Sequence, residues 1–260
     1  RPTLNKQGYP MKIPTTSADK AKFAAARAAI DLVMPGMRLG IGTGSTAAWF
    51  VELLGARVAD GLQVICVPTS SVTEAQAKAL GIPLTSLDEA GWLDLTIDGA
   101  DEFDADLNLI KGGGGALLQE MIVAAASDRM VVISDDSKEV AQMGAFPLPV
   151  EVVRFGWKTT QTLIARLISA MGYADVQITP RQKDGAIFVT DEGHYILDLH
   201  LNKITDARAL SIALNRIPGV VETGLFIDIA HTVLVGYEDG RVRLIDAAGE
   251  GTAMQVEVPE

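Results

Sequence analysis

The stretch Gly40-Ile41-Gly42-Thr43-Gly44-Ser45-Thr46 decides the fold class. It overlaps the end of an apolar run at residues 37–41, which predicts a strand, and it precedes an apolar-periodic run at 47–54, which predicts a helix. Glycines allow a tight turn between the two elements. A strand, a glycine-rich turn and a helix in succession are typical of proteins in which helices cover a parallel sheet.

The same succession recurs along the chain, with hydroxyl or acidic residues after the predicted strands. Further strands are predicted at residues 63–67, 93–97 and 130–134, and a short one at 82–84. Helices are predicted at 18–34 and 72–80. The fold class is therefore α/β, with a mostly parallel, Rossmann-like sheet covered by helices. Ligands of such sheets bind beyond the carboxyl ends of the strands.

A second, smaller domain is predicted near the C-terminal end. Its elements follow the order β-α-β-β-α-β of a ferredoxin-like unit, at residues 150–155, 159–171, 176–178, 187–190 with 195–199, 206–217 and 220–226. Asp191-Glu192-Gly193 predicts a hairpin turn between 187–190 and 195–199. We expect this ferredoxin-like α+β domain at 146–226. The main α/β catalytic domain then comprises 11–145 and 227–260, including a final hairpin of 232–236 and 242–245. Residues 1–10 are set aside as disordered or left over from expression.

Composition excludes several classes of protein. The 260 residues carry 33 acidic and 22 basic side chains, a net charge of -11, which argues against a nucleic-acid partner. Apolar stretches end well before the ~20 residues of a membrane span, and no secretory signal is recognisable. The single cysteine, Cys66, excludes an internal disulfide and fits a reducing compartment, so we expect a cytoplasmic protein. His194, His200 and His231 lie far from the glycine-rich segments, which gives a histidine-based metal site little support.

The glycine turn at 42–46 can hold a phosphate, because glycine permits close backbone approach and helix N–H groups face the ligand. Ser45 and Thr46 add hydroxyl groups and could cap the helix. A tight turn with a capped helix explains the segment equally well. A dinucleotide site is disfavoured, because G-x-G-x-x-G requires glycine where Ser45 stands and no acidic residue ends the second strand. No G-x-x-x-x-G-K-[ST] sequence occurs in this segment either.

Two carboxylates three residues apart, Asp98 and Asp101, follow the predicted strand at 93–97. Carboxylates accept several hydrogen bonds and suit sugar hydroxyls. A solvated acidic turn is the competing interpretation. A calcium loop starting at Asp104 is excluded, because its sixth position is Leu109 instead of glycine and its twelfth is Gly115 instead of glutamate.

Four consecutive glycines, Gly112–Gly115, stand between Lys111 and a predicted helix that contains Glu120. Such a run loses much backbone entropy on ordering, and it makes sense where bare amides must face an oxyanion. Lys111 could add a point charge beside the same ligand. The apolar residues that flank the run argue against a disordered surface loop. Lys138, in Asp135-Asp136-Ser137-Lys138, is either a solvated lysine or an anion ligand.

These segments together resemble the type A ribose-5-phosphate isomerase family. The likeness rests on GTGST at 42–46, DGADE at 98–102, KGGGG at 111–115 with Glu120, and D-x-S-K at 135–138. Two further strings, FPLPVEV at 146–152 and IPGVV at 217–221, extend it along the chain. One departure is Met121, where members of the family commonly carry lysine.

The resemblance implies an aldose–ketose isomerase that interconverts ribose 5-phosphate and ribulose 5-phosphate through an enediolate, without a cofactor or a metal, as a homodimer or homotetramer in the pentose phosphate pathway. It implies that Glu120 is the general base and that Asp98, Asp101 and Lys111 are also catalytic. The four segments should then line one pocket. The implied substrate-binding residues are Thr43, Gly44, Ser45, Thr46, Asp98, Gly99, Ala100, Asp101, Lys111, Gly112, Gly113, Gly114, Lys138 and Lys22.

Two other functions fit an architecture of this kind. A sugar-phosphate sensor would usually carry a DNA-binding module, and no basic helix-turn-helix stretch is evident. An acyl-CoA transferase would use a glutamate as its nucleophile, but the DGADE segment suits a sugar phosphate better. Retention of both Lys111 and Glu120 favours the isomerase over the sensor.

Overall fold

The computed structural model describes residues 12–251 and 253–259. The prediction made for residues 1–10 lies outside this part of the chain. Contacts divide the chain into two compact units. Unit 1 contains the described residues up to Gly99 together with Ile122–Lys138 and those from Ile229 on, and unit 2 contains Ala100–Met121 and Glu139–Asp228. Unit 2 thus includes more of the chain than 146–226, and the boundaries of independently folding domains stay a prediction.

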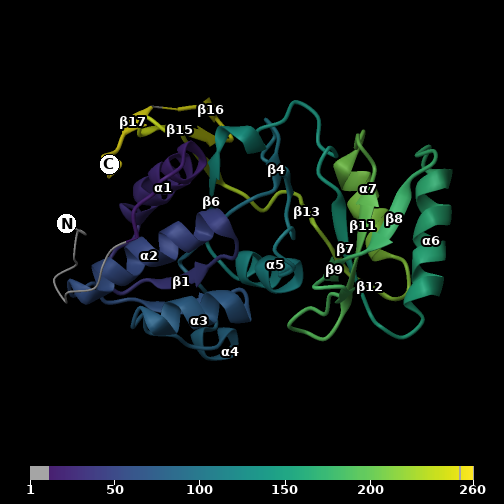
Figure 1. Cartoon of the computed structure of the whole chain (residues 1–260), viewed down its shortest axis with the longest axis horizontal. Helices are drawn as coiled ribbons and strands as arrows, with labels where there is room; N and C mark the ends of the chain where they lie inside the picture. The colour runs from purple at the N-terminus through teal and green to yellow at the C-terminus, as the bar shows by residue number, and fades with distance from the viewer. Residues whose placement is uncertain (1–11, 252, 260) are drawn as a thin grey trace. The chain divides into compact units, whose positions relative to one another are not determined.

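The centre of unit 1 is an eight-stranded sheet (Figure 1). The strands β14, β6, β3, β1 and β2 are neighbours in this order and run parallel. Strand β15 pairs antiparallel with β14, and β16 and β17 pair antiparallel with β15. The mostly parallel sheet and the final hairpin are therefore confirmed. The strands are β1 (Arg38–Ile41), β2 (Ile65–Pro68), β3 (Leu95–Asp98), β6 (Met130–Asp135), β14 (Thr232–Gly236), β15 (Arg241–Asp246), β16 (Gly249–Glu250) and β17 (Met254–Gln255).

Helices cover both faces of this sheet because its strands bury side chains on both sides. On one face, α1 (Ser17–Ile30) and α2 (Ser45–Ala59) pack on Leu39 and Ile41 in the larger core. On the other, Val67 packs with side chains of α4 (Leu87–Ala90) and α5 (Leu117–Ala125). Helix α3 (Ser71–Ala79) follows β2. The prediction of a strand at 82–84 is wrong, since Leu84 makes only an isolated bridge to Cys66.

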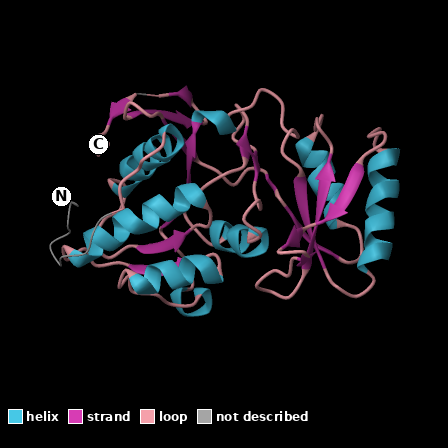
Figure 2. Ribbon diagram, viewed as in Figure 1, coloured by secondary structure: helices cyan, strands magenta, loops and turns pink. Residues whose placement is uncertain are grey.

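Unit 2 contains the predicted β-α-β-β-α-β order, which we interpret as ferredoxin-like (Figure 2). Its four strands form an antiparallel sheet in the order β12-β7-β11-β8, and the two helices share a core with it. The elements are β7 (Leu148–Val152), α6 (Trp157–Ala170), β8 (Gln177–Pro180), β11 (Tyr195–His200), α7 (Ala207–Asn215) and β12 (Val220–Thr223).

Two details of unit 2 correct the sequence prediction. The prediction of a hairpin between 187–190 and 195–199 is wrong. Strand β10 (Ala186–Ile187) pairs with β9 (Gln182–Lys183), while β11 pairs with β7 and β8. Asp191-Glu192-Gly193 still forms a turn, closed by a hydrogen bond from the Thr190 N–H to the His194 carbonyl at 2.9 Å.

The strand predicted at 220–226 is also divided. Its second part, β13 (Leu225–Phe226), joins β5 (Leu109–Ile110) and β4 (Glu102–Phe103) in a separate three-stranded sheet. Strand β5 ends directly before Lys111, whose N–H donates to the Gly224 carbonyl at 2.8 Å. No helix in the described part of the chain is long and apolar enough to span a membrane.

Candidate active site

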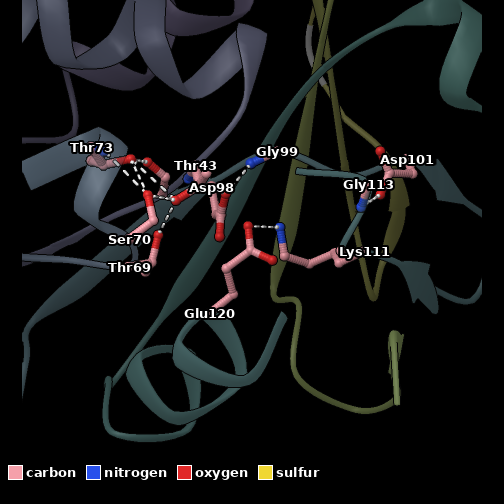
Figure 3. Close-up of polar contacts among 12 residues, drawn as sticks. Thr43, Thr69, Ser70, Thr73, Asp98, Gly99, Asp101, Lys111, Gly113 and Glu120 are labelled. Carbon is pink, nitrogen blue, oxygen red and sulfur yellow. Dashed lines mark hydrogen bonds and ion pairs between the residues drawn. The ribbon is translucent and has the colours of Figure 1, made fainter. Parts of the chain in front are cut away.

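The first candidate group belongs to unit 1 and centres on Asp98, the last residue of β3. Its side chain is buried, and its Oδ1 accepts hydrogen bonds from the N–H groups of Thr43 at 3.1 Å and Gly99 at 2.7 Å (Figure 3). A β-carbon at Gly42 would stand 2.1 Å from the same oxygen. Glycine is therefore required at position 42, because the turn after β1 passes directly against the carboxylate.

A cluster of buried and half-buried hydroxyl groups surrounds the Thr43 side chain. The Thr43 Oγ1 lies 2.7 Å from Thr69 Oγ1, 2.7 Å from Ser70 Oγ and 3.1 Å from Thr73 Oγ1 (Figure 3). Thr73 Oγ1 in turn donates to the Gly42 carbonyl at 2.9 Å. The sequence interpretation missed these partners, although the hydroxyl run after β2 was the available signal. The Thr43 hydroxyl thus connects the glycine turn to the hydroxyl groups that follow β2 in unit 1.

The glycine turn ends at the N-terminus of α2. The suggestion that Ser45 or Thr46 caps this helix is wrong, because the N-cap is Gly44, which has no side chain to do so. Ser45 instead accepts a hydrogen bond from the Lys22 ammonium, with 3.0 Å between Nζ and Oγ. The first N–H groups of a helix lack intrahelical partners and carry partial positive charge, so this end of α2 together with Lys22 suits an anion.

A cavity of about 440 Å³ in unit 1 brings two predicted substrate-binding lysines together. Lys22 reaches it from α1, and Lys138 from the short 3-10 helix Asp136–Lys138 after β6. Asp135 shapes this segment, since its Oδ1 accepts from the Ser137 N–H at 3.0 Å. The remaining lining includes Ser17, Tyr237 and Arg241 as well as the acidic residues Asp135, Asp136, Glu238 and Asp239. Two positive side chains therefore share one hollow although they are more than a hundred residues apart in the sequence.

The second candidate group belongs to unit 2 and is a buried pair of opposite charges. The Lys111 Nζ lies 3.3 Å from the Glu120 Oε1, and the two residues are 2% and 4% exposed (Figure 3). Lys111 follows β5, and Glu120 lies in the first turn of α5, as predicted. Burying two charges costs several kcal/mol per ion before their attraction is counted, so such a pair is weak evidence for stability. We therefore interpret the Lys111–Glu120 pair as a candidate for a role in catalysis.

The tetraglycine run connects these two charged residues, and its first part lies against Asp101. The Gly113 N–H donates to the Asp101 Oδ2 at 2.7 Å (Figure 3). A β-carbon at Gly113 would lie 2.5 Å from the Asp101 Oδ1, so the close approach requires glycine. These contacts favour an ordered binding loop over a disordered surface loop. Gly112 is buried, whereas Gly113 and Gly114 are exposed.

Metal-based and thiol-based chemistry receive no support from the geometry. Within the described residues, no group of three or more His, Cys, Asp or Glu side chains is arranged to hold a metal ion. Burial raises the pKa of the Cys66 thiol to about 12, and the side chain lies in the larger hydrophobic core of unit 1. A thiol of that pKa is protonated at neutral pH and is not a nucleophile.

Comparison with known proteins decides the family. The family described as ribose 5-phosphate isomerase A (phosphoriboisomerase A) matches residues 65–240. The chain belongs to the ribose-5-phosphate isomerase A family. It is therefore an isomerase, and the resemblance read from its motifs is confirmed.

Individual members of the family match over nearly their whole length. The ribose-5-phosphate isomerase A of Cereibacter sphaeroides (strain ATCC 17023) is 63% identical over 229 residues, which cover 88% of this chain and 87% of the relative. The solved ribose 5-phosphate isomerase A of Methanocaldococcus jannaschii is 38% identical, with a TM-score of 0.77 over 92% of this chain and 100% of its own. A D-ribose-5-phosphate isomerase in complex with phospho-erythronic acid is 32% identical, with a TM-score of 0.80 over 93% and 100%.

Proposed function

We propose that this ribose-5-phosphate isomerase A family member interconverts D-ribose 5-phosphate and D-ribulose 5-phosphate through an enediolate, with Glu120 as the general base and no cofactor. The buried Lys111–Glu120 pair is the observation that carries this proposal. Moving a carbonyl between C1 and C2 requires a base for a weakly acidic C–H and donors for the charge that grows on oxygen. A carboxylate 3.3 Å from an ammonium, beside a loop of glycine amides, offers both.

The proposed reaction begins with removal of the C2 proton of the open-chain aldose by Glu120. The electron pair of the broken C–H bond forms the C1–C2 double bond, and the carbonyl electrons move onto O1. Lys111 and the Gly112 and Gly114 amides stabilise this oxyanion, while the Gly113 N–H stays on Asp101. A single oxyanion donor is worth roughly 2.7–4 kcal/mol. Glu120 then returns the proton to C1, the proton of the O2 hydroxyl passes to O1, and O2 becomes the carbonyl oxygen of the ketose. Asp98 and Asp101 bind the sugar, help open the ring and carry the hydroxyl protons.

The substrate phosphate is proposed to bind in unit 1, at the N-terminus of α2. Lys22, Ser45 and Lys138 supply an ammonium, a hydroxyl and a second ammonium to the region that includes the 440 Å³ cavity. Thr43, Gly44 and Thr46 contribute the remainder of the turn, and Gly99 and Ala100 contribute backbone groups. A phosphate at a helix N-terminus with nearby cations is a common arrangement. The complex of a family member with phospho-erythronic acid supports a phosphorylated ligand.

A homodimer or homotetramer, a cytoplasmic location and a role in the non-oxidative pentose phosphate pathway stay predictions that rest on the family.

The direct test is to incubate the purified protein with ribose 5-phosphate alone and follow the appearance of the ketose. The proposal expects catalytic turnover without added CoA, metal or a second protein. A sugar-phosphate sensor would bind ribose 5-phosphate and leave it unchanged, and an acyl-CoA transferase would need an acyl donor. Binding without any ketose would therefore contradict the proposed function.

A further inference from the structure

A guanidinium group contacts the tetraglycine loop in unit 2. Arg181 follows β8, and its side chain forms a two-pronged ion pair with Asp198 on β11. Nε donates to the Asp198 Oδ2 at 3.0 Å, and Nη2 donates to Oδ1 at 2.5 Å. The two side chains are 15% and 16% exposed. This planar, two-point contact fixes the orientation of the guanidinium far better than a lysine in the same place could.

The third nitrogen of the guanidinium contacts the backbone of the glycine loop. Nη1 donates to the Gly112 carbonyl at 2.5 Å and to the Gly113 carbonyl at 3.3 Å. Arg181 stands 69 and 68 residues from these glycines in the sequence. A run of glycines has no side chains that could anchor it, so external contacts must define its conformation.

These contacts determine which way the loop amides point. A peptide group is planar and almost always trans, so its N–H points opposite to its carbonyl. The peptide between Gly112 and Gly113 is held at both ends, by Arg181 at the carbonyl and by Asp101 at the N–H. In the next peptide, the Gly113 carbonyl faces Arg181, and the Gly114 N–H therefore points to the side away from the guanidinium.

We propose that Arg181, braced by Asp198, is a positioning residue that aims the Gly114 amide of the glycine loop at the oxygen of the developing enediolate. The inference rests on the proposed function and assigns to this pair a role in the same reaction. Arg181 acts through the loop and is not a catalytic residue. Donors that are aimed before the reaction starts stabilise the transition state without reorganising, which is where their catalytic value arises.

The first experiment compares Arg181→Lys with a matched control. Arg181→Lys keeps the charge but loses the two-point contact, so the loop carbonyls lose their fixed donor. We expect kcat for ribose 5-phosphate to fall about 10- to 100-fold, as a displacement of about 1 Å in an active site does. KM should stay within about twofold, since the loop amides act mainly in the transition state. Arg208→Lys alters an exposed ion pair of the same unit, with Asp228, and should change neither constant.

Chemical rescue separates positioning from a general loss of stability. In Arg181→Ala, added guanidinium chloride below denaturing concentrations should restore part of the lost kcat, because the ion can occupy the space beside Asp198. The same addition to Arg208→Ala should have no such effect. If Arg181→Ala does not fold, Asp198→Asn takes its place: it leaves the guanidinium but removes one charge of the brace, and its kcat should fall less than that of Arg181→Lys.

A spectroscopic measurement tests the loop without relying on activity. In protein labelled with ¹⁵N-glycine, the Gly112–Gly115 amide signals should shift in Arg181→Lys, whereas the Gly99 signal and the Arg208→Lys spectrum should match the wild type. Unchanged loop signals, or shifted signals with kcat within twofold of the wild type, would overturn the inference. A loss of kcat that guanidinium does not restore and that parallels a fall in melting temperature would also overturn it. An inactive wild type with the expected amide shifts would instead contradict only the proposed function.

Discussion

The two glycine-rich connections of this chain follow a strand and lead into a helix, yet they are built for different tasks. The turn at 42–46 in unit 1 is braced by hydroxyl groups and by the Asp98 carboxylate, and it opens onto a helix N-terminus beside Lys22. The glycine run at 112–115 in unit 2 stands between the buried ions Lys111 and Glu120, and Arg181 holds the Gly112 and Gly113 carbonyls. Glycine alone therefore does not specify a function; the charged groups around the glycines do.

The first turn suits an anion that is bound throughout the reaction, because it offers helix N–H groups and ammonium groups. The second suits charge that appears only during the reaction, because it combines a carboxylate, an ammonium and loop amides. Substitutions in the first should therefore alter KM, and substitutions in the second should alter kcat.

The largest effect is expected from Glu120→Gln in the second connection. The amide keeps the size of the side chain but cannot remove a proton, so kcat should fall by about 10²–10⁴-fold. KM for ribose 5-phosphate should change little, because Glu120 is not proposed to bind the phosphate. Steady-state kinetics provides the measurement, and Glu74→Gln, on an exposed face of α3, is the control. Near wild-type turnover would remove Glu120 from the role of base.

Lys22→Met and Lys138→Met test the first connection. A hydrogen bond to a charged group contributes about 1.5–3 kcal/mol, so each substitution should raise KM by about tenfold or more. The effect on kcat should be smaller, because the phosphate does not react. Lys78→Met removes an exposed lysine that pairs with Glu74 and should leave KM unchanged. A fall in kcat without a rise in KM would place these lysines in the chemical step and end the proposed division.

A pair of glycine substitutions tests how tightly the first connection is packed. Gly42→Ala should lower the free energy of unfolding by about 1–3 kcal/mol or more, because its methyl group would collide with Asp98. Gly99→Ala should be tolerated, since its methyl group would meet its nearest neighbours at 3.8 Å and 3.9 Å. Urea denaturation of both variants checks the contrast. Equal stabilities would mean that Asp98 is not fixed by the turn.

The smallest effect concerns Cys66, which reports on the opening of unit 1. Because burial raises the pKa of this thiol to about 12, a disulfide reagent at pH 8 should modify the native protein only as fast as unit 1 opens. Gly42→Ala should accelerate this labelling, and Glu120→Gln should not.

The raised pKa of Cys66 also means that folding favours the neutral thiol. The stability that comes from keeping this thiol neutral is complete below the ordinary pKa of 9.0, and it is lost as the pH rises towards 12.

Local signals predicted much of unit 1 from the sequence. Apolar runs such as 37–41 and 130–134 end in glycine, hydroxyl or acidic residues, and these patterns fix strands and turns without knowledge of distant partners. The order of elements in unit 2 was equally accessible. The pairing of its strands was not predictable in the same way. The segment 195–199 was assigned the wrong neighbour, because alternation of apolar and polar residues identifies a strand but not the strand it pairs with.

The candidate site shows the same limit. Glu120 and Lys111 were found because they stand only nine positions apart in the sequence, with the run of glycines between them. Thr69, Ser70 and Arg181 were missed, since their partners lie 26, 27 and 69 residues away and no short motif contains both members of each pair. The two-residue strands β4 and β5 were missed for a related reason, because segments so short have no periodicity to detect.

The most direct test of the central claim follows hydrogen at C2 of ribose 5-phosphate in D₂O by NMR. If Glu120 carries the proton between C2 and C1, the wild type should convert aldose to ketose and introduce some deuterium at C1 of the product. Glu120→Gln should neither form ketose nor wash out the C2 hydrogen at a comparable rate. Loss of the C2 hydrogen at the wild-type rate in Glu120→Gln would show that another group removes the proton, and the account of this buried pair would be wrong.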